Sequence, residues 1–463
     1  MGKHKITYDL LLSALLIVLL FFPILQQTTG MFSVRPLNGV FVPTPKPEPS
    51  LESYQNNVYQ PQIEKYVSEN FGLREPFIRL YNQYLWDFYR KTNVSKEQLE
   101  FGEKGWFFAP GAISDYYQRQ FHYFAADSLQ MASMLSREAQ RILQLQEVLE
   151  SHGTHLFVCL VPAKDLVCPE YLPKEPDTIY KGESKISARF FNEEEFTRLG
   201  VNHLNLERYF LQMKDTADFM LFPKTGMHWS RYAALYGADT IVRYMEHLGG
   251  INMRNLVIGP RTLGNAIDPD DDLEQLLNLQ RPVRKPKYYY AECMTDGDTT
   301  AIKPKVIVVG DSFWWTIAVQ IPIYEVFSTA PYWYYNSTIY YDSRYNSVSQ
   351  VDLAEELLSA DFVVLSYCAT QQYRMNDGFT QKALEALNVE GAAMDSASFI
   401  ERETLRVICD LIADPNAMKS IREKAERYNK TIAKAVRDDA NWIVNYKIEQ
   451  GLLKWPEQNK ETN

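Results

Sequence analysis

The chain has 463 residues, of which 46% are hydrophobic, and it carries a formal net charge of −10. This length and composition can bury one large core with smaller appendages. The acidic balance and the absence of a long basic run argue against nucleic acid as a partner. The five cysteines form no C-x-x-C pair and no metal-ligand spacing, so we predict no metal site and no cofactor. Cys159 and Cys168 could still pair in an oxidising compartment.

The amino terminus predicts a membrane-spanning helix. Residues 1–5, which include Lys3, His4 and Lys5, are basic, and residues 10–25 are almost entirely apolar. Extended back to Ile6, the stretch is about twenty residues long, enough to cross a hydrocarbon core. Its basic flank favours the cytoplasmic side, with the bulk of the chain outside. Residues 26–30 lack a small-x-small cleavage site, which favours a retained anchor over a cleaved signal peptide. We expect a single-pass cell-membrane protein, periplasmic in a Gram-negative bacterium.

A proline-rich segment and a helical segment follow the predicted anchor. Five prolines fall between residues 36 and 49, which predicts an extended, semi-rigid spacer over residues 31–58. Apolar and aromatic residues then recur at helical intervals over residues 59–90. Residues 99–108 contain two glycines and resemble a hairpin at the entry to the main domain.

Strand and helix patterns alternate through the middle of the chain. Residues 128–151 have helical period, and residues 155–161 and 201–206 read as strands. Further strands are expected at 305–310 and 361–366. This alternation predicts an α/β fold, a doubly wound parallel sheet flanked by helices. From residue 399 the pattern is charged and helical, and it ends in a polar tail. The expected parts are an anchor (1–30), a linker (31–58), the main α/β domain (59–398) and a helical extension with its tail (399–463).

The most informative feature is the sequence Val-Ile-Val-Val-Gly-Asp-Ser-Phe, which ends at Phe313. A buried strand stopping at Gly310 places Ser312 at a strand-to-helix turn on the carboxyl edge of the sheet. There the backbone N–H groups that open the next helix can stabilise an oxyanion. In the alternative interpretation, Asp311 and Ser312 only cap that helix. We interpret Asp311 itself as a structural cap.

A second candidate site lies upstream, at His228. The sequence Lys-Thr-Gly-Met-His-Trp-Ser ends at Ser230, a plausible N-cap for a helix over residues 231–248. A serine hydroxyl needs an imidazole to take its proton, and a histidine on a rigid turn can do so. Trp229 can fix the position of the ring. The alternative is a hydrogen-bonded structural histidine.

Other residues near these two candidates have more than one interpretation. Asn336 could supply a second oxyanion donor, or it could be an ordinary turn residue. The aromatic stretch 332–341 could stack on sugar rings, although alternating aromatics also suit a packed strand. The acidic run 268–272 lacks the spacing of a calcium loop and is expected to be a solvated turn. The candidate substrate contacts are Trp229, Trp314, Trp315 and Tyr334.

Taken together and in this order, several motifs resemble the SGNH-fold acetyltransferases of the AlgJ/AlgX type, which O-acetylate exopolysaccharides such as alginate outside the cytoplasmic membrane. The resemblance covers roughly residues 70–370. The histidine precedes the serine, as in the alginate group and unlike ordinary SGNH esterases. The motifs are Asn-Phe-Gly-Leu-Arg-Glu (70–75), Gly-Glu-Lys-Gly-Trp-Phe-Phe (102–108), Val-Pro-Ala-Lys (161–164), Pro-Glu-Tyr-Leu-Pro (169–173), His-Trp (228–229) and Gly-Asp-Ser-Phe (310–313).

The resemblance implies Ser312 as nucleophile and His228 as general base, with an acyl-serine intermediate. It also implies an orienting acid two residues before the histidine, where this chain has Gly226. Three explanations remain open. The site could work as a Ser–His dyad, it could take an acid from elsewhere such as Asp165 or Asp218, or it could be degenerate and kept for binding.

The resulting expectation is a membrane-anchored, extracytoplasmic O-acetyltransferase that modifies a cell-surface or exported polysaccharide. The resemblance further implies a multi-span membrane-bound O-acyltransferase as the partner that supplies the acyl group. A carbohydrate esterase with the same Ser–His site is one alternative. The other is a non-catalytic polysaccharide-binding or assembly subunit.

Overall fold

The computed structural model describes residues 2–39, 44–96, 98–116, 128–174, 188–390 and 396–453. The expected polar tail, 456–463, and part of the expected spacer, 40–43, lie outside these ranges. The chain forms two compact units. The first contains residues 1–94 together with 274–284, and the second contains residues 95–273 and 285–463.

A six-stranded sheet with the order β11-β10-β9-β12-β3-β4 is the centre of the second unit. All neighbouring strands are parallel except β10 and β11, which form an antiparallel pair at one edge. The predicted doubly wound parallel sheet is therefore confirmed, with one antiparallel edge strand. The strands are β3 (His155–Val161), β4 (His203–Asn205), β9 (Val306–Gly310), β10 (Tyr332–Tyr334), β11 (Thr338–Tyr340) and β12 (Phe362–Cys368).

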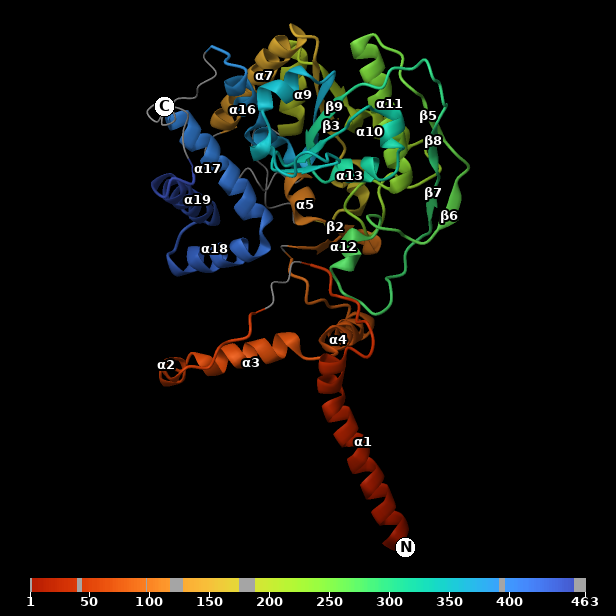
Figure 1. Cartoon of the computed structure of the whole chain (residues 1–463), viewed down its shortest axis with the longest axis vertical. Helices are drawn as coiled ribbons and strands as arrows, with labels where there is room; N and C mark the ends of the chain where they lie inside the picture. The colour runs from red at the N-terminus through yellow and green to blue at the C-terminus, as the bar shows by residue number, and fades with distance from the viewer. Residues whose placement is uncertain are drawn as a thin grey trace. The chain divides into compact units, whose positions relative to one another are not determined.

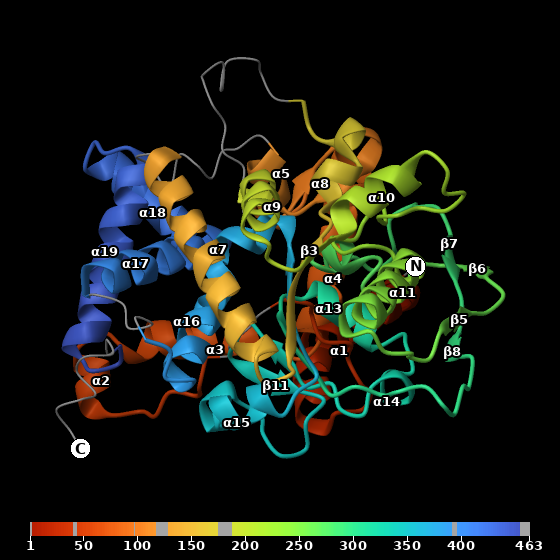
Figure 2. The same ribbon diagram turned by 90° about the horizontal axis from the view of Figure 1, so that it is seen from above.

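Both faces of this sheet are buried, because successive side chains of each strand enter different cores. Phe157, Cys159 and Val308 join one core, whereas Val158 and Val309 join the other. Figures 1 and 2 show the helices on the two sides. The first core is covered by α10 (Leu206–Lys214), α11 (Arg231–Gly249) and α13 (Phe313–Ala318), and the second by α7 (Ser128–Glu150), α9 (Ala188–Leu199), α15 (Leu353–Leu358) and α16 (Phe379–Ala386).

Smaller elements complete the second unit. The expected hairpin at 99–108 is β1 (Glu100–Phe101) paired with β2 (Phe107–Phe108), and α5 (Pro110–Tyr116) follows it. Two small antiparallel pairs lie beyond α11, on the opposite side of the sheet from the C-terminal helices (Figure 1). They are β5 (Leu256–Ile258) with β8 (Cys293–Thr295) and β6 (Thr262–Gly264) with β7 (Tyr288–Tyr290). The short helices are α8 (Lys164–Val167), α12 (Asp272–Gln275) and α14 (Ile323–Val326).

The expected C-terminal helical extension consists of α17 (Ser396–Ala413), α18 (Pro415–Arg427) and α19 (Ile432–Glu449). These helices share a third apolar core, which also takes in Met134 and Leu135 from the first turns of α7. The extension is thus packed onto the sheet domain through α7.

The first unit is helical. Its α1 (Gly2–Thr29) includes an apolar stretch, Asp9–Thr29, of 21 residues, which is long enough to cross a membrane. Both an anchor and a signal sequence have this length and composition. The helical stretch expected at 59–90 is two helices, α3 (Tyr59–Asn70) and α4 (Arg74–Tyr89), preceded by the single-turn α2 (Leu51–Gln55).

The possible disulfide between Cys159 and Cys168 does not form, and this expectation is wrong. Both residues are buried free thiols. Each is enclosed by the apolar core beside the sheet, and burial raises the pKa of the Cys168 thiol to about 12. Neither thiol is therefore in the thiolate form that disulfide exchange requires.

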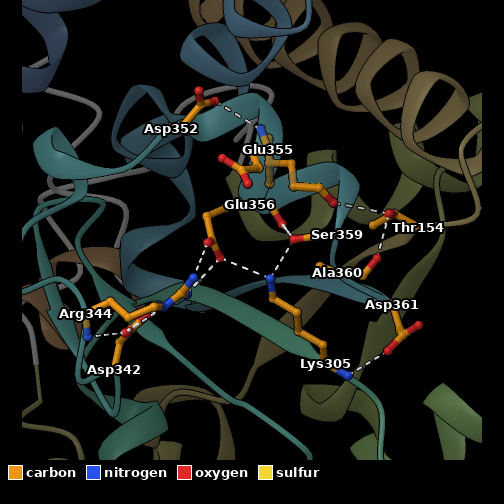
Figure 3. A network of polar contacts seen from close by, with 11 residues as sticks. Thr154, Lys305, Asp342, Arg344, Asp352, Glu355, Glu356, Ser359, Ala360 and Asp361 are labelled. Atoms are coloured by element: carbon orange, nitrogen blue, oxygen red, sulfur yellow. Dashed lines mark hydrogen bonds and ion pairs between the residues drawn. The ribbon is translucent and has the colours of Figure 1, made fainter.

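An ion-pair network fixes the amino ends of the central strands (Figure 3). Lys305, directly before β9, donates from its ammonium group to Glu356 at 3.1 Å and to Ser359 at 2.6 Å. The Arg344 guanidinium binds both oxygens of Glu356, at 2.5 and 3.0 Å. The backbone N–H of Lys305 donates to Asp361, which precedes β12. The strands β9 and β12 are therefore held in register at the edge opposite to the one where Ser312 lies.

We predict that Glu356→Gln lowers the free energy of unfolding by about 2 kcal/mol at neutral pH, because two cations lose their shared carboxylate. Hydrogen bonds from Arg344 hold the pKa of Glu356 below its ordinary value. Its contribution is therefore complete above that ordinary value and is lost as the pH falls through the lowered pKa. Urea unfolding at several pH values measures this loss. The interpretation fails if wild type and variant lose stability equally on acidification.

Candidate active site

Ser312 lies at the carboxyl edge of the sheet, between the end of β9 at Gly310 and the start of α13. Its side chain is partly exposed. The neighbouring Asp311 is buried and points elsewhere. Its carboxylate accepts hydrogen bonds from the backbone N–H of Phe313 at 3.1 Å and of Cys368 at 2.6 Å. Asp311 therefore joins the turn to the end of β12, which fits the expected structural role.

The structure brings His228 to Ser312, although 84 residues separate them. The imidazole Nε2 lies 2.8 Å from the Ser312 Oγ, within hydrogen-bonding distance. The ring is buried and packs on Phe313, with 4.7 Å between ring centroids. Ser230, just beyond it, caps α11 by accepting from the Ala233 N–H, as the sequence predicts. The histidine is thus fixed by the helix that follows it and by the helix that Ser312 opens.

Asp272 is the third member of the site, and the sequence analysis missed it. Its Oδ2 lies 2.6 Å from the His228 Nδ1. Its Oδ1 accepts from the backbone N–H groups of Met227 and Leu273, both at 2.7 Å. The carboxylate therefore has a fixed orientation, and it holds the imidazole with Nε2 toward the serine.

This geometry corrects three expectations. The run 268–272 is not a solvated acidic turn, because Asp270 is buried and accepts hydrogen bonds from Tyr290 and the Arg231 N–H. The orienting acid is not Asp218, which forms an ion pair with Arg261. Nor is it Asp165, because the contact to the imidazole comes from Asp272. The Ser–His pair is therefore not a simple dyad.

The close approach of the acidic loop explains the glycine at position 226. A Cβ atom there would lie 2.7 Å from the carbonyl oxygen of Pro269 and 2.8 Å from the carbonyl carbon of Asp270. The space for an acidic side chain two residues before His228 is filled by the loop that delivers Asp272. The carboxylate is thus supplied from a different part of the chain.

Two opposing effects set the pKa of His228. Burial alone lowers it, because the charged ring loses its hydration, but the Asp272 carboxylate, together with smaller effects of Asp311 and Asp268, outweighs burial and the pKa is raised. A general base must begin neutral, so a base at this position would act only above the raised pKa. Asp272 thus makes the ring a stronger base, but it also narrows the pH range in which the ring is neutral.

Lys164 braces the loop that carries His228. Its ammonium group is buried and donates to three backbone carbonyls, those of Phe107 and Gly226 at 2.7 Å and that of Lys224 at 3.2 Å. It also lies 4.9 Å from the ring centroid of Trp106. Burial lowers the pKa of Lys164 to about 7, whereas three carbonyl acceptors match the three protons of the charged form. The side chain therefore joins β2 to the loop 224–226.

Asn336 lies at the same sheet edge as Ser312, because Tyr334 is paired with Gly310 in the parallel register of β10 and β9. Its side-chain amide donates to the Asp377 carbonyl at 3.2 Å, and its Oδ1 has no hydrogen-bond partner among the described residues. Its role as an oxyanion donor remains a prediction.

The four candidate substrate contacts divide into two pairs. Trp229 and Trp314 are only 0% and 1% exposed and belong to the apolar core, so the expectation that they contact a substrate is wrong. Trp315 and Tyr334 are partly exposed and lie in an aromatic cluster beside Ser312, where Trp315 packs edge-on against Tyr340 at 4.4 Å. Within the described residues, no group of His, Cys, Asp and Glu is arranged to hold a metal ion.

We predict that Asp272→Asn slows the labelling of Ser312 by a serine-directed phosphonate about 10³-fold, because the neutral amide no longer fixes the tautomer of His228. The acid limb of the pH profile should move to lower pH, since the pKa of His228 loses the carboxylate that raises it. Adding Gly226→Asp should not restore labelling, because the acidic loop fills that space. Recovery in the double variant would contradict this account.

Lys164→Met should slow the same labelling about 10²-fold per folded molecule, because the loop preceding His228 loses its three hydrogen bonds. Lys305→Met is a matched control at the amino edge of the sheet, where the lysine also binds polar groups. The control should lose stability but keep its labelling rate. Equal rates in the two variants would show that Lys164 is merely structural.

Comparisons with known proteins find one family model that matches the part of the chain carrying the site. Residues 99–316 match the family model described as "SGNH hydrolase-like domain, acetyltransferase AlgX". No curated protein matches the chain. Similar solved structures include the O-acetyltransferase domain of Pseudomonas putida AlgJ, with 13% identity, a TM-score of 0.38, and coverage of 61% of this chain and 99% of that one.

Two further structures have comparable similarity. Bacillus cereus PatB1 has 14% identity and a TM-score of 0.34, over 52% of this chain and 91% of that one. Pseudomonas aeruginosa AlgX has 15% identity and a TM-score of 0.36, over 61% and 65%. The match to the family model covers the turn of His228 and the strand and turn of Ser312. The chain therefore carries an SGNH hydrolase-like domain of the AlgX acetyltransferase type.

Proposed function

We propose that this protein is a membrane-anchored, extracytoplasmic O-acetyltransferase that moves an acetyl group through Ser312 onto hydroxyls of a polysaccharide. The observation that carries this proposal is the continuous hydrogen-bond chain from Asp272 through His228 to a partly exposed serine. In this arrangement Ser312 is the nucleophile, His228 the general base and Asp272 the orienting acid.

In the first half-reaction the Ser312 Oγ attacks the carbonyl carbon of the acyl donor, and its proton passes to the His228 Nε2. The Ser312 backbone N–H, with Asn336 as a candidate second donor, stabilises the oxyanion. The tetrahedral intermediate collapses, and the leaving group takes the proton from His228. The product is an acyl-serine ester.

In the second half-reaction an acceptor hydroxyl attacks the acyl-serine, and His228 Nε2 takes its proton. Collapse returns that proton to the Ser312 Oγ and leaves the acetyl ester on the acceptor. Asp272 stays ionised and stabilises the imidazolium in both steps. Water in place of the sugar would give hydrolysis by the same chemistry.

A polysaccharide acceptor is supported by the AlgX-type domain and by the aromatic cluster beside Ser312. Trp315 and Tyr334 are partly exposed there, and flat aromatic faces suit sugar rings. The proposed acyl donor is a multi-span membrane-bound O-acyltransferase, with α1 as the anchor that keeps this chain near it. The basic residues 3–5 would lie on the cytoplasmic side.

We expect incubation of the full chain with an acetyl ester donor and oligosaccharides to yield acetylated oligosaccharide, detected by mass spectrometry. Ser312→Ala and His228→Ala should each lower product formation by at least about 10³-fold, since both act in the same steps. Ser337→Ala, an exposed serine at the same edge, is the matched control and should retain full activity.

The outcomes separate the three candidate functions. Free acetate without acetylated sugar, dependent on Ser312, would identify a carbohydrate esterase. If a serine-directed phosphonate labels nothing at Ser312 and no acetyl group is moved, the chain would be a binding or assembly subunit.

A further inference from the structure

The helix α4 carries its apolar side chains on the outside. Phe77, Leu80, Tyr81, Tyr84 and Phe88 are between 47% and 74% exposed. Their spacing of three, four, seven and eleven residues from Phe77 puts them on one face of the helix. We call these five residues the aromatic stripe. With 16 residues the helix is about 24 Å long, so the stripe runs along most of one side.

The opposite face of α4 is polar and buried. Arg79 donates to the carbonyl of Pro36 at 2.6 Å, Asn82 donates to that of Leu277 at 2.9 Å, and Gln83 accepts from the backbone N–H of Arg281 at 2.8 Å. All three side chains are at most 9% exposed. A helix at a protein–water surface has the reverse arrangement, with apolar residues inside. These contacts therefore hold the aromatic stripe outward.

The turn that leads into α4 lies against the C-terminal part of α1. At Gly72, two residues before α4 begins, a Cβ atom would lie 2.1 Å from the carbonyl oxygen of Pro23 and 2.8 Å from the backbone nitrogen of Gln27. The two backbones are thus in direct contact at the end of the apolar stretch Asp9–Thr29. Figure 1 shows α4 beside this end of α1.

We propose that the aromatic stripe of α4 lies in the interfacial region of the bilayer, beside the point where α1 leaves the hydrocarbon core. This inference rests on the proposed membrane anchoring by α1. Tyrosine and phenylalanine next to the end of a spanning helix have the composition and position of an interfacial belt. The stripe contains no charged residue, and the adjacent Asp87 is paired with Arg281 at 2.6 Å.

The consequence is a second attachment point for the first unit. A single spanning helix leaves the attached chain free to tilt and rotate, whereas a helix in the interface fixes the orientation of the unit that contains both. Gly72 provides the close junction between them, because any side chain there would separate the two backbones.

Photo-crosslinking in the full chain tests this inference. Benzoylphenylalanine is introduced at Tyr84, and the protein is reconstituted into vesicles of phosphatidylcholine and phosphatidylglycerol. We expect about tenfold more phospholipid adduct, identified by mass spectrometry, than with the same group at Trp442, an exposed aromatic position on α19. Adding Leu80→Asp and Phe88→Asp should reduce the adduct at position 84 to the level of the control.

Alkaline extraction of the same vesicles tests α1 separately. Protein that resists extraction but forms no lipid adduct at position 84 would overturn the placement of the stripe and leave the anchor intact. Extracted protein that still forms the adduct would show that the stripe contacts lipid, but it would overturn both the anchor and the placement of the stripe beside a spanning helix. Adducts in host membranes that join position 84 only to another protein would show that the stripe is a protein-binding surface.

Discussion

The candidate active site depends on how closely the acidic loop 268–272 approaches Gly226. Because position 226 has no side chain, the backbone at Pro269 and Asp270 can occupy the adjoining space, and Asp272 reaches the imidazole. The same carboxylate accepts the N–H of Met227, so it holds the peptide before the histidine as well as the ring. One contact between two loops therefore sets the tautomer, the orientation and the basicity of His228 together.

The rest of the sheet domain keeps that contact in place from both ends. At the amino edge, Lys305 and Arg344 meet on Glu356 and fix β9 against the helix before β12. At the carboxyl edge, the Asp311 carboxylate joins the turn of Ser312 to Cys368, the last residue of β12. Lys164 binds the carbonyls before the histidine. A hydrogen-bond chain with successive distances of 2.6 and 2.8 Å requires this rigidity, since small displacements of catalytic groups cost large factors in rate.

The sequence predicts those features that depend on neighbouring residues in the chain, such as strand ends and helix caps. A β-branched run ending at Gly310 is sufficient to place Ser312 at a strand end, and Ser230 is recognisable as a helix cap. Asp272 could not be found in this way, because it lies 44 residues beyond His228 and its approach depends on tertiary packing. Two features of the sequence could have pointed to it: Gly226 stands where the family has an acid, and the run of aspartates at 268–272 had no assigned role. The burial of Trp229 and Trp314 could not be predicted from the sequence either. A tryptophan next to a site residue can face the core or the solvent, and the sequence pattern is the same in both cases.

In the proposed reaction Ser312 first accepts the acetyl group and then donates it, so the site holds only one substrate at a time. In the proposed reaction the acyl-serine separates the arrival of the acetyl group from its transfer, so a membrane-bound donor and a bulky polysaccharide can use the same opening in turn. Attachment to the bilayer then matters for the first step, because confining both proteins to one surface raises the local concentration of the donor. Attachment at two points adds orientation to proximity. An apolar helix face that is held outward by polar contacts on its other side would serve that purpose.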